Sequence, residues 1–260
     1  MNMKTFAHTG DLGDVVYALP TIKALGGGEL YLFPDNNVRE PFTLNRAYNI
    51  GNLLMHQPYI RSWTLLSQPV QDSFDYDFRE WRAAYNGSDN IAYSQAAHFG
   101  VDPKVADEPW LTVDAVRVAP VVVCRSHRYR QHDFPWLAIA ERWGGESACI
   151  GIKSEFEELQ YLYGFRTYLP TPTLWEMARV IAGAELVVTN QTAAYAIAEG
   201  LKKPAVLLER WEAYPNVDFV REGVYTGERV KQYIADHPVK APPIAAPRIM
   251  GTRASVAVTA

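Results

Sequence analysis

The sequence predicts an α/β protein in which two Rossmann-like halves, each with a parallel sheet, face each other across a cleft. Three observations predict this class. Residues 4–33 have the pattern of a strand, a helix and a second strand, the same order begins again at residue 120, and short apolar strands then alternate with helices to residue 208. Buried strands that alternate with helices form parallel sheets covered on both faces. Ligands of such sheets bind beyond the carboxyl ends of the strands.

The first half starts with a strand at residues 4–9 and a helix in which apolar residues recur at helical spacing. The polar segment between them, Gly10-Asp11-Leu12-Gly13-Asp14, is therefore a strand-to-helix turn. The other elements that we expect in this half are a strand at 30–33, a strand at 74–78 and a helix at 90–100.

The second half restarts with a strand at residues 120–124, which has Pro120 at its first position. The further elements that we expect are strands at 147–152, 186–189 and 205–208 and helices at 174–184 and 193–201. The chain therefore divides into an N-terminal Rossmann-like domain at residues 1–118, a C-terminal one at 119–237, and a tail rich in Pro and Ala at 238–260.

The charge and hydropathy of the chain limit its partners. Its 260 residues carry a formal net charge of −4, which argues against a protein that coats nucleic acid but leaves room for a local basic groove. No apolar run approaches the roughly 20 residues of a membrane-spanning helix, and no signal-peptide core precedes the first strand. We expect a cytoplasmic protein without integral membrane association, and its oligomeric state stays open.

The sequence offers little for a metal or a disulfide. Cys124 and Cys149 are too few, and too embedded in predicted strands, for a disulfide framework or a zinc site, so we expect buried thiols. Asp75-Tyr76-Asp77 has the D-x-D form of a metal site but lies within a strand-like stretch, so we expect no metal there. The aromatic run at residues 76–93 is expected to pack in the core and surface, and if exposed it would stack on a sugar or a base.

The first turn offers a carboxylate at the start of a helix. Its glycine spacing, Gly10-x-x-Gly13, fits neither common phosphate-loop motif, and two aspartates would repel a phosphate. Asp14 can instead serve as a general base that the helix dipole keeps ionised. The alternative is that Asp14 caps the helix.

Two further turns follow predicted strands. The first of these, residues 125–130, is rich in Arg and His, and arginine forks suit a diphosphate, so we expect Ser126, Arg128 and Arg130 to bind one. The other runs from Asn190 through Gln191 and Thr192 into a helix that starts with Ala193. Free N–H groups at that helix start would hold a phosphate, and Asn190 or Thr192 would also cap the helix.

Taken together, these turns resemble those of glycosyltransferase family 9, the heptosyltransferase-like enzymes with the GT-B fold. The residues that carry the resemblance are the opening segment at 10–25, the segment from 186 to 204, Phe134-Pro135-Trp136 before a helix, and residues 93–101. The resemblance implies an N-terminal acceptor-side domain and a C-terminal domain that binds a nucleotide-sugar donor.

The resemblance also implies a reaction and its residues. Asp14 takes the position of the base that removes the proton of the acceptor hydroxyl, in an inverting transfer from a nucleoside diphosphate sugar. No metal or cofactor is required if helix N-termini and arginines stabilise the leaving diphosphate. Those groups would be Gly13, Ser126, Arg128, Arg130, Asn190, Gln191, Thr192 and Ala193.

The donor turn departs from the family pattern, which has Asp, then Ser or Thr, then Gly, and a His a few residues later. This chain has Asn190, Gln191 and Thr192, with Tyr195 in the place of the His. The base and sugar of the donor are therefore not identified. Glu209 ends the strand after Pro204, where a carboxylate would bind the ribose hydroxyls of the nucleotide.

Two acceptors and two other functions remain open. The chain is shorter than the heptosyltransferases that it resembles, which suggests an acceptor other than the lipopolysaccharide core: a saccharide, or a hydroxylated DNA base. A DNA acceptor requires base flipping and a basic groove, for which the candidates are Arg61, Arg79, Arg82 and Lys104. The other functions are a non-catalytic nucleotide-binding module and an NAD-dependent oxidoreductase, in which Asp35 would bind the ribose.

Overall fold

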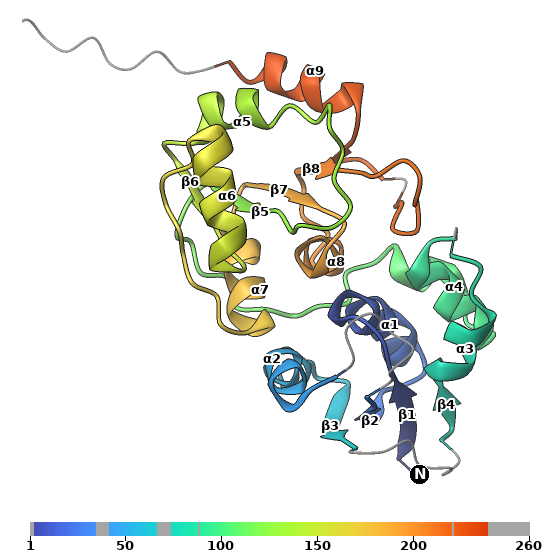
Figure 1. The fold of residues 1–260 in the computed structure, drawn as a ribbon. Coiled ribbons are helices and arrows are strands. Elements are labelled where there is room, and N and C mark those ends of the chain that lie inside the picture. Colours follow the sequence, from blue (N-terminus) through green and yellow to red (C-terminus); the bar gives the residue numbers. More distant parts are fainter. Residues whose placement is uncertain (1–2, 35–41, 67–73, 88, 220, 239–260) are drawn as a thin grey trace, which may run out of the picture.

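Two parallel sheets organise the chain, as the sequence predicts (Figure 1). The computed structural model describes residues 3–34, 42–66, 74–87, 89–219 and 221–238. Asp35 and the tail beyond Pro238 lie outside these residues. The division into domains after residue 118 stays a prediction, and the crossing from the first sheet to the second lies between residues 106 and 121.

The first sheet has the strand order β3-β2-β1-β4, and its neighbouring strands are all parallel. The elements of this half are β1 (Lys4–His8), α1 (Leu12–Ala24), β2 (Gly28–Leu32), α2 (Leu44–Met55), β3 (Ile60–Leu65), β4 (Tyr76–Asp77), α3 (Phe78–Ala84), α4 (Ile91–His98) and the 3₁₀ helix η1 (Pro103–Ala106). Because β1 is an inner strand, the turn that follows it opens at the middle of the sheet edge.

The second sheet has the order β6-β5-β7-β8-β9 and is also parallel throughout. Its elements are β5 (Val121–Cys124), α5 (Trp136–Trp143), β6 (Ser147–Cys149), α6 (Lys153–Tyr163), α7 (Leu174–Gly183), β7 (Leu186–Asn190), α8 (Ala193–Gly200), β8 (Val206–Glu209), β9 (Val224–Tyr225) and α9 (Glu228–Asp236). The inner strands β5 and β7 end at the two turns that the sequence singles out, after Cys124 and Asn190.

Helices from the two halves pack against each other between the sheets. Helix α1 contacts α8 and α2 contacts α7, and Figure 1 shows α1 and α8 lying between the two sheets. One apolar core runs through this contact and includes Phe6, Leu19, Val187 and Ile197, all fully buried. Because burial of apolar surface stabilises this contact, it fixes how the edges of the two sheets face each other.

Several elements differ from the sequence-based expectation. The strand expected at 74–78 is limited to β4, because the Asp77 carboxylate accepts a hydrogen bond of 2.9 Å from the backbone N–H of Arg79 and caps α3. The helix expected at 90–100 is present as α4, which Asn90 caps. The sequence patterns did not predict α2, β3, α3, η1, α6, β9 and α9.

Both cysteines are buried and free, as expected. Burial raises the pKa of the Cys149 thiol to about 12 and that of Cys124 still further. The thiols are therefore protonated at neutral pH and act as small apolar side chains.

Candidate functional site

A cavity of about 610 Å³ lies where the two halves meet, and we call it the central cavity. The first half lines it with residues that include Asp14 and Arg46, and the second half with residues that include Ser126, Arg128 and Thr192. These residues follow or neighbour the carboxyl ends of inner strands. The central cavity is therefore at the place where open parallel sheets bind their ligands.

The N-termini of α1 and α8 approach each other in the central cavity. A Cβ atom added to Gly13 would lie 3.8 Å from the backbone nitrogen of Ala193. Thr192 is the N-cap of α8, and its hydroxyl accepts a hydrogen bond of 3.2 Å from the N–H of Ala194. Helix N-termini attract anions through their free N–H groups and their dipole, so this part of the cavity favours a phosphate.

Asp14 lies in the first turn of α1 and forms an ion pair with Arg82 of α3. The N-cap of α1 is Asp11, so the alternative that Asp14 caps the helix is wrong. The Asp14 side chain is only 14% exposed. Its burial raises the pKa of the carboxyl against the opposing charge of Arg82, whereas the sequence analysis considered only the helix dipole, which lowers it.

Gly10 leaves room for this ion pair. Its φ of +119° is a conformation that L side chains rarely adopt, and a Cβ atom on it would overlap the Arg82 guanidinium. The turn after β1 therefore requires glycine for two reasons, its backbone conformation and the close approach of Arg82.

Two uncharged side chains, Gln95 and His8, lie beside the backbone of Asp14. The side-chain amide of Gln95 donates a hydrogen bond of 3.3 Å to the backbone carbonyl of Asp14, and its nitrogen lies 3.4 Å from His8 Nε2. Burial, with a smaller contribution from the charge of Arg82, lowers the pKa of His8 to about 3. His8 is therefore uncharged at neutral pH. No pattern in the sequence points to a role for Gln95 or His8.

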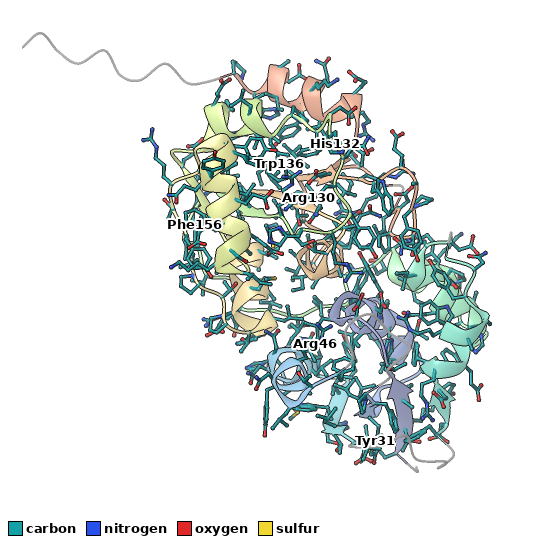
Figure 2. The ribbon with its side chains drawn as sticks, in the orientation of Figure 1. Tyr31, Arg46, Arg130, His132, Trp136 and Phe156 are labelled. Atoms are coloured by element: carbon teal, nitrogen blue, oxygen red, sulfur yellow. The ribbon has the colours of Figure 1, made fainter. Side chains whose placement is uncertain are left out.

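Two arginines converge on Asp11 from different elements. Arg128 Nη1 lies 2.9 Å from Asp11 Oδ2 and so joins the two halves, while Arg46 Nη2 lies 3.7 Å from Asp11 Oδ1. Figure 2 labels Arg46 on α2. The hydroxyl of Ser126 accepts a hydrogen bond of 3.2 Å from the backbone N–H of Arg128, which shapes the second turn. The structure thus brings Ser126 and Arg128 into the cavity, as the sequence analysis expects.

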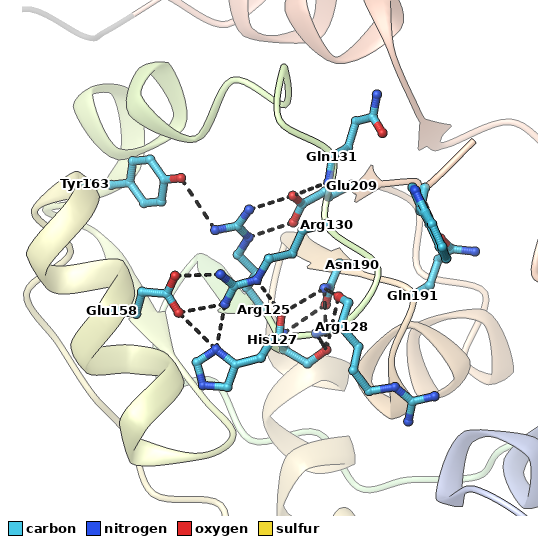
Figure 3. A network of polar contacts seen from close by, with 12 residues as sticks. Arg125, His127, Arg128, Arg130, Gln131, Glu158, Tyr163, Asn190, Gln191 and Glu209 are labelled. Atoms are coloured by element: carbon cyan, nitrogen blue, oxygen red, sulfur yellow. Dashed lines mark hydrogen bonds and ion pairs between the residues drawn. The ribbon is translucent and has the colours of Figure 1, made fainter. Parts of the chain in front are cut away.

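Arg130 points away from the central cavity, which is a correction to the predicted site. Its guanidinium makes two hydrogen bonds of 2.6 Å to the carboxylate of Glu158 on α6, and His127 lies 3.0 Å from the same carboxylate (Figure 3). These hydrogen bonds from Arg130, with a smaller contribution from its charge, lower the pKa of Glu158. Arg130 therefore attaches the second turn to α6 and does not line the cavity.

Asn190 is fully buried and acts on the second turn. Its side-chain oxygen accepts a hydrogen bond of 3.0 Å from the N–H of Ser126, and its side-chain nitrogen donates to the carbonyls of Ser126 and Arg128 (Figure 3). Asn190 therefore holds the residues that line the cavity without lining it itself, and it does not cap α8.

Glu209 also lies away from the cavity, so we assign it a structural role in place of the expected contact with a ribose. It is fully buried, and its two oxygens each accept a hydrogen bond of 2.7 Å from Arg125. One of these oxygens also accepts a hydrogen bond of 2.9 Å from the backbone N–H of Gln131. The burial of Arg125 explains this pairing, because a buried guanidinium requires a counter-charge.

The predicted site residues fall into two groups. Those that line the central cavity are Gly13, Asp14, Ser126, Arg128, Gln191, Thr192 and Ala193. Arg130, Asn190 and Glu209 lie behind its wall. Arg46, which enters the cavity from α2, was not predicted, and Arg82 was proposed only for a DNA groove. No spacing in the sequence places either arginine beside Asp11 or Asp14.

The two aspartates of the D-x-D motif support the fold. Asp75 accepts hydrogen bonds from the backbone N–H and the hydroxyl of Thr5, at 2.8 and 3.1 Å. Asp77 caps α3 and forms an ion pair with Arg79. Within the part of the chain that the structure describes, no group of three or more His, Cys, Asp and Glu side chains could hold a metal ion.

The basic residues proposed for a DNA groove do not gather. Arg79 and Arg82 are each paired with an aspartate. Arg61 lies on the edge strand β3, whereas Lys104 lies on η1, which packs against α4 and α1. None of the helices in the described ranges is long and apolar enough to cross a membrane.

Comparisons with known proteins match this chain at the level of structure. No protein-family model and no curated protein matches its sequence. The E. coli heptosyltransferase WaaC, solved with ADP-2-deoxy-2-fluoro heptose, has 15% identity and a TM-score of 0.52, over 90% of this chain and 99% of that one. The chain has the heptosyltransferase fold. The predicted GT-B architecture, two facing parallel α/β halves with a cleft, is therefore confirmed.

Two further solved proteins share the heptosyltransferase fold. The glycosyl transferase family 9 protein from Veillonella parvula has 8% identity and a TM-score of 0.56, over 91% of this chain and 90% of that one. The dodecameric, iron-containing heptosyltransferase TibC of E. coli, solved with ADP-D-beta-D-heptose, has 17% identity and a TM-score of 0.51. That match covers 86% of this chain and 64% of TibC.

Proposed function

We propose that the protein is an inverting glycosyltransferase that moves a sugar from a nucleoside diphosphate to an acceptor hydroxyl. One observation carries the proposal: the buried carboxylate of Asp14 lines the same cavity as the N-terminus of α8 and Arg128. A base and an anion-binding surface that face one cavity are the two parts that this transfer needs. The heptosyltransferase fold supports the same reaction class.

Asp14 is the proposed general base. Burial raises its pKa toward the pH at which the enzyme would work, which makes it a better proton acceptor while it is still ionised. The acceptor hydroxyl gives its proton to this carboxylate as its oxygen bonds to the anomeric carbon. The bond from that carbon to the diphosphate oxygen breaks, and the diphosphate leaves with the electron pair. A single displacement from the opposite face inverts the anomeric centre.

The second half is the proposed donor side. The backbone at Thr192 and Ala193 and the guanidinium of Arg128 would bind the diphosphate and stabilise the charge that develops on it. The nucleotides bound to WaaC and TibC support an ADP-linked sugar as the donor. The sugar itself is open, since Gln191 and Tyr195 depart from the family pattern.

We propose transfer without a metal, because Arg128 and the α8 N-terminus supply positive charge at the diphosphate. TibC is an iron-containing heptosyltransferase, so this part of the proposal needs its own test. We expect the rate of transfer to stay the same after removal of metals with a chelator. A loss that added iron or magnesium restores would overturn it.

The test of the function is to measure ADP release from ADP-glucose and ADP-heptose by the wild type and by Asp14→Asn, with methyl glycosides as acceptors and with water alone. The loss of a general base is expected to lower turnover about 10²- to 10⁴-fold, with ADP affinity nearly unchanged. Glu185→Gln, which removes an exposed carboxylate outside the cavity, is the control. Unchanged turnover in Asp14→Asn, or equal loss of turnover and ADP binding, would contradict the role. ADP binding without any turnover would identify a non-catalytic nucleotide-binding module.

A further inference from the structure

Three aromatic side chains of the second half, Tyr129, Trp211 and Tyr214, cluster beside the central cavity, and we call them the aromatic platform. The centroid of the Tyr129 ring lies 5.9 Å from those of Trp211 and Tyr214, and the two tyrosine rings are parallel within 2°. Tyr129 lines the cavity, and Trp211 is 40% exposed. A large apolar side chain left open to solvent beside a cavity of this size is typical of a ligand contact.

The backbone of the platform is strained at Tyr129. Its φ of +53° is unusual for a bulky residue and costs energy that the surrounding structure must offset. Arg128 helps to hold the ring, because its guanidinium donates a hydrogen bond of 2.9 Å to the Tyr129 hydroxyl and lies 4.9 Å from the ring centroid. Strain of this kind concentrates at functional sites.

Gln191 holds the other two rings in place. Its buried side-chain oxygen accepts a hydrogen bond of 2.8 Å from the backbone N–H of Trp211, and its nitrogen donates one of 2.7 Å to the carbonyl of Tyr214. The side chain at a position where the family pattern has Ser or Thr is thus used to position the platform. The Gln191 side chain loses rotamer entropy when it makes these two hydrogen bonds, and in return it orders a loop that is partly exposed.

The platform reaches the first half next to Asp14. A Cβ atom on Gly87, in the loop after α3, would lie 3.5 Å from the Tyr214 hydroxyl. Burial raises the pKa of Tyr214, Tyr129 and the charge of Asp14 raise it further, and the charges of Arg82 and Arg128 oppose this rise. The platform therefore borders the same ion pair that holds the base.

Resting on the glycosyl transfer proposed above, we propose that the aromatic platform binds the ring face of a neutral saccharide acceptor and directs one of its hydroxyls to Asp14. The C–H face of a sugar ring packs on aromatic side chains. Arg82 is paired with Asp14, and Arg128 is assigned above to the donor diphosphate, so little free charge remains beside the platform for a phosphorylated acceptor.

The side chains of Arg82 and Arg128 are partly exposed, and their guanidinium groups can donate to the hydroxyls of such a ring. Arg82 Nε and Arg128 Nε are buried and have no hydrogen-bond partner among the residues that the structure describes. A hydroxyl oxygen accepts from such donors without adding charge. In the transfer, the proton of the reacting hydroxyl passes to Asp14 while its oxygen bonds to the anomeric carbon and the diphosphate leaves.

The experiment is saturation-transfer NMR on the full chain with ADP present, and its probes are the methyl glycosides of glucose, galactose and mannose. We expect at least one of these sugars to receive saturation on its ring C–H protons. We expect Trp211→Ala to raise its dissociation constant about tenfold, the effect of losing one stacking contact, and Tyr214→Ala to do the same. The control is Tyr161→Ala on α6, which removes an aromatic ring that is 88% exposed and leaves sugar binding unchanged.

Three results would overturn the platform. The first is the absence of saturation on all three sugars. The second is equal sugar binding by Trp211→Ala and the wild type, at unchanged melting temperature. The third is displacement of the sugar by glucose 6-phosphate, or by a duplex with a hydroxymethylated base, at one tenth of the concentration at which the unlabelled sugar displaces itself. The ADP signals in the same sample test the donor site independently. If the wild type does not bind ADP but binds a sugar in a Trp211-dependent way, the proposed function is refuted and the role of the platform in sugar binding is retained.

Discussion

Arg82 and Asp14 form an ion pair between helices α3 and α1 at the edge of the central cavity. The two effects on the carboxyl are opposite, because burial raises its pKa and the arginine lowers it. Gly10 makes the contact sterically allowed. The arginine thus sets the pH range in which a buried carboxylate stays ionised and able to accept a proton.

Replacement of Arg82 is expected to shift the acid limb of the pH profile. Arg82→Gln removes the charge that lowers the pKa of Asp14, so the pKa rises and kcat/KM begins to fall at a higher pH than in the wild type. The measurement is kcat/KM for donor turnover against pH. Arg79→Gln, on the same helix but paired with Asp77, is the matched control. An acid limb at the same pH in Arg82→Gln and the wild type would contradict the role of Arg82.

His8 is expected to make the fold sensitive to acid. Its pKa is lowered from 6.5 to about 3 by burial, so below pH 6.5 the unfolded chain binds a proton that the folded chain does not. The free energy of unfolding should therefore fall as the pH falls from 6.5 toward 3, by up to about 1.4 kcal/mol per pH unit. Urea unfolding at several pH values measures this slope.

A matched pair of variants isolates the contribution of His8. His8→Gln should flatten the dependence between pH 6.5 and 4, whereas His132→Gln, which removes an exposed histidine, should keep the slope of the wild type. The same slope in His8→Gln and the wild type would show that another group causes the acid sensitivity.

Arg128 and Arg130 are expected to differ in nucleotide binding, although they lie two residues apart. Arg128 lines the central cavity and Arg130 is held by Glu158 behind it. Arg128→Ala should weaken ADP binding about ten- to one-hundred-fold, the loss of hydrogen bonds to a charged group. Arg130→Ala should change it less than about twofold. Calorimetry with ADP compares the two, and a larger loss in Arg130→Ala would place the diphosphate elsewhere.

Glu209 is expected to matter for stability. Glu209→Gln leaves the buried guanidinium of Arg125 without its counter-charge, which should cost about 3–5 kcal/mol of unfolding free energy. Glu185→Gln breaks an exposed pair with Arg117 and should cost less than about 1 kcal/mol. Denaturant unfolding measures both. If Glu209→Gln is as stable as the wild type but binds ADP more weakly, Glu209 contacts the ribose, as the sequence predicted, and the structural role is wrong.

Local patterns were enough to predict the architecture and the three turns. The turn at residues 10–14 stands between a strand and a helix of different periodicity, and Asn190 follows a run of buried strand residues. Both patterns depend on neighbours in the chain. Apolar periodicity did not predict α6, because polar residues dominate this helix and only Phe156 and Leu159 are buried apolar side chains.

The direction of each side chain could not be predicted, because it depends on residues far along the chain. Arg128 and Arg130 look alike in the sequence, yet Asp11 attracts one and Glu158 the other. The carboxylate of Glu209 pairs with Arg125, 84 positions away. Arg82 reaches Asp14 only because α3 packs beside β1, which no spacing in the sequence reveals.

The most direct test of the central claim is to measure the stability of the purified protein with ADP, UDP, GDP, CMP, their common sugar conjugates and NAD. We predict that ADP and an ADP-linked sugar add roughly 2.7 kcal/mol to the free energy of unfolding at about 100 times their dissociation constant. Stabilisation by NAD alone, or by none of these ligands, would contradict the assignment of the central cavity to a nucleotide-sugar donor.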